Sequence, residues 1–230
     1  MIRKNVFILI ALLYSISVTV AAFIMEKNII MDIHGYITAI VSFIVAFKIM
    51  HTAIRTHDKG ILLYIVLGIS CLALGNLYFF LLGIVGIVPS VISVGLFTKI
   101  CCYLFFIAAL LEYKKEAGEK GSLNYILINS ITFILTAACA YAVLANNIYV
   151  LNSSVLLMDV FCIVLASGLL RNKNARFFAC LMLMVAALDI ISAIQIFAFT
   201  GVFIKSLSPL LYLLFAMLIE SVKDGDAHAR

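Results

Sequence analysis

Two aspartates and one lysine interrupt stretches of sequence that are otherwise strongly apolar. Asp159 and Asp189 each lie near the middle of such a stretch, and Lys99 lies within another. A charge among apolar groups is costly unless an opposite charge neutralises it, so we expect Lys99 to pair with one aspartate. The other aspartate would then hold a proton or bind a ligand. The three residues predict an acid/base or ligand-binding cluster.

Three neutral polar side chains could join this cluster. Asn76 and Gln195 offer amide groups within apolar stretches, and Tyr212 offers a hydroxyl. All six residues are therefore candidates for ligand binding or proton handling. In the alternative interpretation the charges form an ion pair that only fixes helix register, and the neutral groups only hydrogen-bond neighbouring helices. The sequence leaves both interpretations open.

The chain contains none of the common catalytic motifs. GxSxG, HExxH, P-loop and GxGxxG patterns are missing from the sequence, which argues against nucleotide-driven transport and standard hydrolase chemistry. The six cysteines lie in apolar runs without a CxxC pair. His34 and His51 lie near opposite ends of one apolar stretch, too far apart to share a ligand. We expect no metal and no cofactor, and enzymatic activity stays an open question.

The composition indicates an integral membrane protein. Of the 230 residues, 66% are hydrophobic and 12% are charged, and the mean hydropathy is +1.23. A membrane-spanning helix needs about 20 mostly apolar residues. Eight segments meet this requirement, which predicts an all-α bundle with a single membrane domain over residues 1–230. The segments are residues 5–25, 33–54, 60–87, 90–111, 123–145, 148–170, 176–199 and 203–222.

The third and fourth segments are separated only by small residues and one proline. Gly83 and Gly86 precede Pro89 and Ser90 within a long apolar run. Glycine and proline favour a tight turn, so we place a turn here between two helices. Without that turn the number of spans would fall to seven.

The basic residues predict the orientation of the chain. Of 16 Lys and Arg residues, 13 lie at the two termini and in the loops near residues 48–59, 112–121 and 171–176. Short loops rich in Lys and Arg stay on the cytoplasmic side. Both termini are therefore predicted to be cytoplasmic. The net charge of +5 is explained by this orientation and by anionic lipid, so no nucleic-acid partner is expected.

The chain also contains short strings that recur. Residues 73–76 (Ala-Leu-Gly-Asn) resemble residues 187–189 (Ala-Leu-Asp), and Leu110-Leu-Glu resembles Leu218-Ile-Glu. We infer an internal repeat in which residues 1–115 correspond to residues 122–224. Because each half would hold four helices, the two halves would be parallel, with an axis along the membrane normal.

This tandem pattern resembles the eight-helix membrane modules that precede bacterial diguanylate cyclase and kinase domains. The resemblance rests on residues 73–78, Pro89-Ser90 and Tyr103-Leu-Phe-Phe, loosely repeated as Asp189 and Tyr212-Leu-Leu-Phe. It implies a sensory or ligand-binding role in a bacterial inner membrane. Because no output domain follows the last helix in this sequence, a signal would pass to a partner signalling protein.

A second resemblance is to the lysoplasmalogenases, eight-helix membrane hydrolases of similar length. Leu188-Asp189 and the helix that contains Tyr212 fit that family's pattern. Gly75-Asn76 stands where the family has Gly-Asp, and the family's histidine is missing before Tyr103. This departure removes the expected general base.

The sequence therefore leaves three functions open. The first is a sensory module that binds a lipid or another small hydrophobic ligand through the polar cluster. The second is a lysoplasmalogenase-like lipid hydrolase. The third is a small carrier that uses the charged residues for proton coupling.

Overall fold

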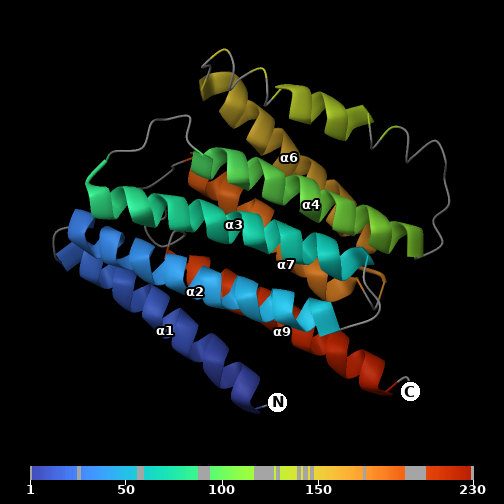
Figure 1. The fold of residues 1–230 in the computed structure, drawn as a ribbon, viewed down its shortest axis with the longest axis horizontal. Helices are drawn as coiled ribbons and strands as arrows, with labels where there is room; N and C mark the ends of the chain where they lie inside the picture. Colours follow the sequence, from blue (N-terminus) through green and yellow to red (C-terminus); the bar gives the residue numbers. More distant parts are fainter. Residues whose placement is uncertain are drawn as a thin grey trace.

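The computed structural model describes most of the chain, and every regular element in that part is an α-helix. The described residues are 2–24, 27–55, 60–87, 94–116, 127, 130–138, 141, 145, 148–172, 175–194 and 206–228. The helices, with the labels of Figure 1, are α1 (Ile2–Ile24), α2 (Lys27–Arg55), α3 (Gly60–Val85), α4 (Val94–Glu116), α6 (Ile148–Leu169), α7 (Arg176–Ile194) and α9 (Ser208–His228).

These helices occupy most of the predicted segments, with different ends. Helix α2 begins at Lys27 rather than at residue 33, and α4 continues to Glu116 rather than ending at residue 111. Hydropathy finds only the apolar part of a helix, whereas polar residues can extend the helix beyond that part. Only about half of the predicted segment 123–145 is described, and residues 130–138 within it are helical; residues 195–199, at the end of segment 176–199, lie outside the described residues.

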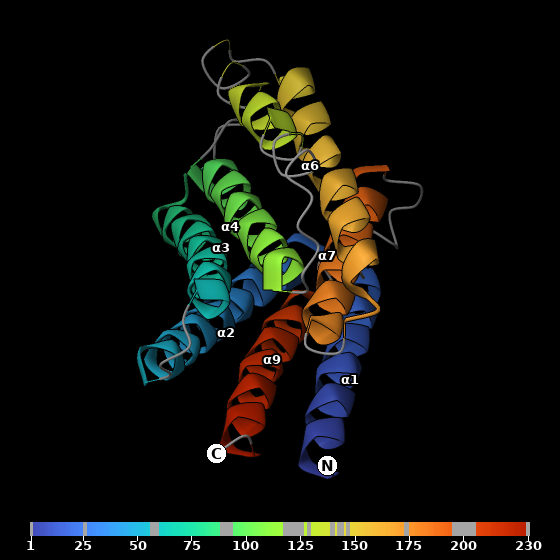
Figure 2. The same cartoon turned by 90° about the vertical axis from the view of Figure 1, so that its right-hand side faces the viewer.

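The bundle is built from neighbouring antiparallel helices. Helix α3 packs between α2 and α4, and α1 and α9 both pack against α2. Helices α6 and α7 form a pair that contacts α4 through α6 and α9 through α7. Figure 1 and Figure 2 both place the N- and C-termini at the same end of the bundle. The ends of α2 and α4 and the start of α3 therefore lie at this end as well.

Small residues allow α3 and α4 to approach closely. A Cβ atom added to Gly68 would lie 2.6 Å from Cε1 of Phe106, and Gly75 and Gly95 face Thr98 and Phe79 in the same way. Small residues are typical of the contacts between membrane helices. Phe106 itself is completely buried and packs edge-on against Phe178 of α7. The core thus joins helices from both halves of the chain.

Helix α3 ends at a glycine, as the sequence predicts. Gly86 has φ of 72°, a left-handed conformation that glycine adopts without steric cost. The N–H of Ile87 donates to the carbonyl of Leu82, and the N–H of Gly86 donates to the carbonyl of Gly83. This pair of hydrogen bonds is the Schellman motif, which satisfies the last carbonyls of a helix. Residues 60–87 and the following apolar run are therefore two helices rather than one.

Among the described residues, two helices are long and apolar enough to cross a membrane: the segments Ile29–Ile54 and Gly60–Val85. Only 33% of each apolar window is buried inside the protein, which differs from the largely buried core helix of a soluble protein. Large apolar side chains are exposed along the outer faces of the described helices, for example Ile44, Phe47 and Leu74. Such an extensive apolar surface is typical of a protein surrounded by lipid.

Candidate functional site

An ion pair joins α4 to α7 inside the bundle. Nζ of Lys99 lies 2.9 Å from Oδ2 of Asp189, with 33% and 28% of the two side chains exposed. The hydroxyl of Tyr103, one turn after Lys99, donates a hydrogen bond to the same carboxylate oxygen. The pairing of Lys99 with one aspartate, expected from the sequence, is therefore present. Asp189 receives a charged and a neutral donor at once.

Asp159 of α6 lies beside this ion pair and is almost completely buried, with 1% of its surface exposed. Within the described residues, neither of its carboxylate oxygens has a hydrogen-bond partner. The hydroxyl of Tyr103 and the charged groups of Asp189 and Lys99 are its polar neighbours. The single hydroxyl proton of Tyr103 is donated to Asp189, which leaves Asp159 without it. The aspartate that Lys99 does not neutralise is thus the more deeply buried of the two.

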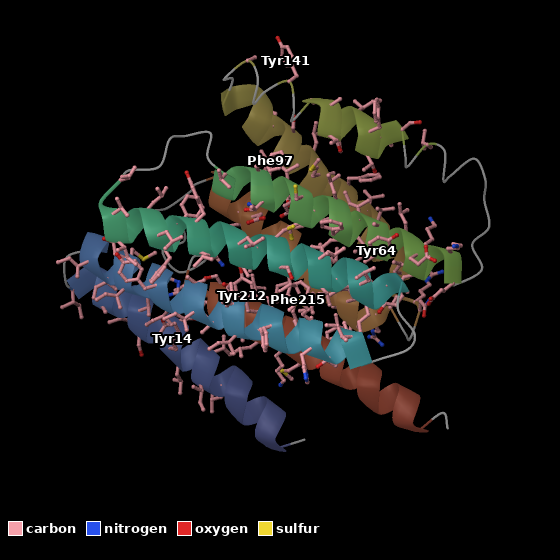
Figure 3. The ribbon with its side chains drawn as sticks, in the orientation of Figure 1. Tyr14, Tyr64, Phe97, Tyr141, Tyr212 and Phe215 are labelled. Atoms are coloured by element: carbon pink, nitrogen blue, oxygen red, sulfur yellow. The ribbon has the colours of Figure 1, made fainter. Side chains whose placement is uncertain are left out.

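Asn76 and Tyr212 form a second polar contact across the bundle. Nδ2 of Asn76 on α3 donates to the hydroxyl oxygen of Tyr212 on α9 over 2.6 Å. Figure 3 shows Tyr212 and Phe215 inside the bundle, between α9 and the pair α2 and α3. Five of the six candidate residues are thus placed in two polar contacts and one buried carboxyl group. Gln195 lies outside the described residues.

A cavity of about 940 Å³ reaches two of these groups, Asn76 and Asp189. Asp189 and Asn76 lie on its wall, and exposed residues such as Asp32 and Ile87 form its rim. It lies between α2, α3, α7 and α9, at the end of the bundle opposite the two termini. Its lining residues are Met31, Asp32, His34, Gly35, Tyr36, Thr38, Asn76, Phe79, Phe80, Leu82, Gly83, Gly86, Ile87, Val185, Leu188, Asp189, Ser208 and Leu211.

His34 is a cavity residue that sequence analysis did not include among the candidates. Only 4% of it is exposed. Its Nδ1 lies 3.1 Å from the hydroxyl of Tyr14, and its Nε2 lies 3.3 Å from Oγ1 of Thr38. Thr38 in turn contacts Oγ of Ser208. His34 and Thr38 are four residues apart and therefore lie on one helix face. This spacing of two polar residues was the feature of the sequence that could have indicated a role for His34.

The described residues contain no group of three or more His, Cys, Asp or Glu side chains placed to hold a metal ion. The five cysteines in this part of the chain (Cys71, Cys101, Cys102, Cys162 and Cys180) carry free thiols. The polar groups of the site are instead carboxylates, an ammonium, hydroxyls, an amide and an imidazole. These groups can bind a polar head group or hold a proton.

In the part of the chain that the structure describes, fold and site define a helical protein with two helices able to span a membrane and a largely apolar cavity that carries a few polar groups and opens at one end. Comparison with protein-family models, with curated proteins and with solved structures gives no match for this chain. The two family resemblances drawn from the sequence stay expectations. Function is therefore inferred from the cavity and its side chains.

Proposed function

We propose that the chain is a multi-pass protein of a bacterial inner membrane that binds a lipid or small hydrophobic molecule and acts as a sensory module. One observation carries this proposal: the cavity between α2, α3, α7 and α9 runs from an exposed rim to Asp189. Its volume of about 940 Å³ falls in the range of about 300–1,000 Å³ typical of small-molecule sites. Apolar walls with few polar groups are typical of such sites as well.

The proposed orientation places the cavity on the extracytoplasmic side. The termini lie at one end of the bundle, together with the ends of α2 and α4 (Figure 1). Lys114, Lys115 and Arg176 lie near that end, which the positive-inside rule assigns to the cytoplasm. The cavity mouth lies at the opposite end. Eight spanning helices with both termini inside would give this arrangement.

Through the ion pair, ligand binding in the cavity can affect the packing of the helices that reach the cytoplasmic end of the bundle. A ligand that contacts Asp189 changes the balance of charge at the contact between α4 and α7. Helix α7 also packs against α9, which ends at the C-terminus. A ligand can shift such a contact only by its differential affinity for two arrangements of the helices. We infer that a partner signalling protein detects this shift at the cytoplasmic face.

The proposal is tested by identifying what co-purifies with the protein. Gly35 lies on the cavity wall, and a Cβ atom added there meets no atom within 4 Å. We expect Gly35→Phe to fill part of the cavity and to deplete the bound lipid or metabolite that mass spectrometry finds in the wild-type protein. Gly168 also has open space but does not line the cavity, so Gly168→Phe is the matched control. Identical extracts from wild type and Gly35→Phe would contradict the proposal.

A lipid hydrolase is the second candidate, because His34 and Asp189 line the same cavity. An imidazole hydrogen-bonded to Tyr14 and Thr38 could act as a general base. This histidine comes from α2, not from α4 as the lysoplasmalogenase pattern requires. Hydrolysis of an ether lipid by the purified protein, lost in His34→Gln, would favour the enzyme over the sensor. The proton-coupled carrier depends on Asp159, the buried carboxyl group without a paired cation among the described residues.

A further inference from the structure

We propose that the cavity selects a ligand with a positively charged amine head group and an apolar body. This inference rests on the proposed function as a ligand-binding module and specifies the chemical class of the ligand. It follows from the charges on the cavity lining, the aromatic and apolar side chains of its walls and the hydrogen bonds of His34.

The formal charges on the cavity lining are negative. Asp32 at the rim and Asp189 at the inner wall carry carboxylates, and none of the described lining residues is Lys or Arg. Lys99 neutralises Asp189 from the side of α4 and is not a lining residue. An anion that enters the cavity would therefore meet the carboxylate of Asp189 before the ammonium group. Like charges repel most strongly where little water screens them, so an anionic ligand is disfavoured.

The walls suit an ammonium group attached to an apolar body. Tyr36 and Phe80 meet edge to face with their ring centroids 5.3 Å apart, and Phe79 lies on the same wall. Aromatic faces attract cations through the negative charge of the ring face. On the opposite wall, Val185, Leu188 and Leu211 present only apolar atoms. A head group near Asp32 and the aromatic rings would leave the body of the ligand against these side chains.

The hydrogen bonds of His34 are satisfied by a neutral ring. Oγ1 of Thr38 donates its proton to the backbone carbonyl of His34, so it can only accept from Nε2. Nδ1 can then accept from the hydroxyl of Tyr14. A neutral imidazole with its proton on Nε2 fits both contacts. With the ring in that form, the two carboxylates are the charged groups among the described lining residues.

Three probes with one apolar body test the charge preference. In lipid nanodiscs at neutral pH, 3-phenylpropylamine is a cation, 3-phenylpropanol is neutral and 4-phenylbutanoate is an anion. Binding of each is measured by saturation-transfer NMR titration. The variants are Asp32→Asn and, as a control, Glu116→Gln, which removes an exposed carboxylate at the other end of the bundle.

We expect the cation to bind the wild-type protein at least about fivefold more tightly than the alcohol, which corresponds to about one exposed ion pair. Asp32→Asn should reduce this preference and leave binding of the alcohol unchanged, while Glu116→Gln should change neither. Equal binding of cation and alcohol, or tightest binding of the anion, would overturn the charge inference but leave a ligand-binding cavity. If none of the probes binds more weakly to Gly35→Phe than to wild type, the cavity is not the binding site and both proposals fail.

Discussion

Phe106 of α4 and Phe215 of α9 stack face to face, with ring centroids 5.3 Å apart and ring planes inclined by 14°. Each phenylalanine follows a tyrosine by three residues, Tyr103 in one case and Tyr212 in the other. Each tyrosine contacts a polar residue of the opposite half of the chain, Asp189 on α7 or Asn76 on α3. The two halves therefore meet through equivalent aromatic and polar contacts.

These equivalent contacts support the proposal that residues 1–115 and 122–224 are two copies of one four-helix unit. Helix α4 packs against α6 in the same way that α9 packs against α2, as a two-fold relation between the halves would require. In this scheme Asp189 corresponds to Asn76, and Lys99, four residues before Tyr103, corresponds to the neutral Ser208, four residues before Tyr212. One copy would thus have kept or gained charge while the other is neutral. Only the charged copy would be suited to ion or proton chemistry.

The two tyrosines provide a matched pair of substitutions. Tyr103→Phe removes a hydrogen bond to a carboxylate, whereas Tyr212→Phe removes one to an amide. Hydrogen bonds to charged groups contribute about 1.5–3 kcal/mol and neutral ones about 1 kcal/mol. We expect Tyr103→Phe to destabilise the protein more, measured by thermal or SDS unfolding in detergent. Tyr141→Phe, at an exposed position, should change little. A larger effect of Tyr212→Phe would contradict the ranking.

The depth of the charged residues was predictable from the sequence, but their direction around each helix was not. Hydropathy places Asp159 and Asp189 at similar depth, so either could have been the partner of Lys99. Which aspartate faces Lys99 depends on the rotation of α4, α6 and α7 about their axes. These helices have low amphipathicity, so the sequence pattern does not indicate that rotation. In a membrane helix, apolar residues face both lipid and protein, so the usual pattern of one apolar face is lost.

The cavity was not predictable for a related reason. It is formed by ends of four helices that are distant in sequence, and most of its wall consists of ordinary apolar and aromatic residues. The participation of His34 depends on Tyr14 of a neighbouring helix. Local signals such as Gly86 at the end of α3, in contrast, act within a few residues and were visible in the sequence.

The Lys99–Asp189 ion pair predicts a non-additive pair of substitutions. Lys99→Met leaves a carboxylate without its cation, and Asp189→Leu leaves an ammonium without its anion. Because about a third of each side chain is exposed, we expect each single change to destabilise by about 1–3 kcal/mol, between the values for surface and buried pairs. The double variant Lys99→Met with Asp189→Leu should recover most of this loss in a double-mutant cycle of unfolding free energies. Additive losses would mean that the two charges do not depend on each other.

The close approach of α3 and α4 predicts that one glycine is indispensable. A methyl group at Gly68 would overlap the buried ring of Phe106, which stacks on Phe215 and cannot move freely. Overpacking of this kind destabilises by about 1–3 kcal/mol. Gly168→Ala, in a helix position with open space, should instead be neutral or slightly stabilising. The comparison is made by the unfolding temperature of both variants, and equal temperatures would contradict the packing argument.

The proposed orientation predicts which positions are accessible from outside the cell. In a variant without the six native cysteines, Ile87→Cys should react with a membrane-impermeant maleimide in intact cells, because Ile87 is exposed beside the cavity mouth. Asn172→Cys, in the predicted cytoplasmic segment 171–176, should react only after the cells are opened. Labelling of Asn172→Cys in intact cells would reverse the orientation.

Substitution of Asp159 distinguishes a functional role of its carboxyl group from a structural one. Its carboxyl group is buried and makes no hydrogen bond among the described residues, so its presence reduces stability. We expect Asp159→Leu to raise the unfolding free energy in detergent by about 1–3 kcal/mol, whereas Asp189→Leu lowers it because Lys99 loses its partner.

A buried group that costs stability is retained for a role, and natural proteins commonly show this trade-off at functional sites. The more stable Asp159→Leu protein should therefore have lost ligand response or proton-dependent flux in vesicles, whichever activity the wild type shows. Loss of flux would favour the carrier, and loss of ligand response with no flux in the wild type would favour the sensor. A stable Asp159→Leu protein with full activity, together with a stable and fully active Asp189→Leu protein, would rule out a functional role for this cluster.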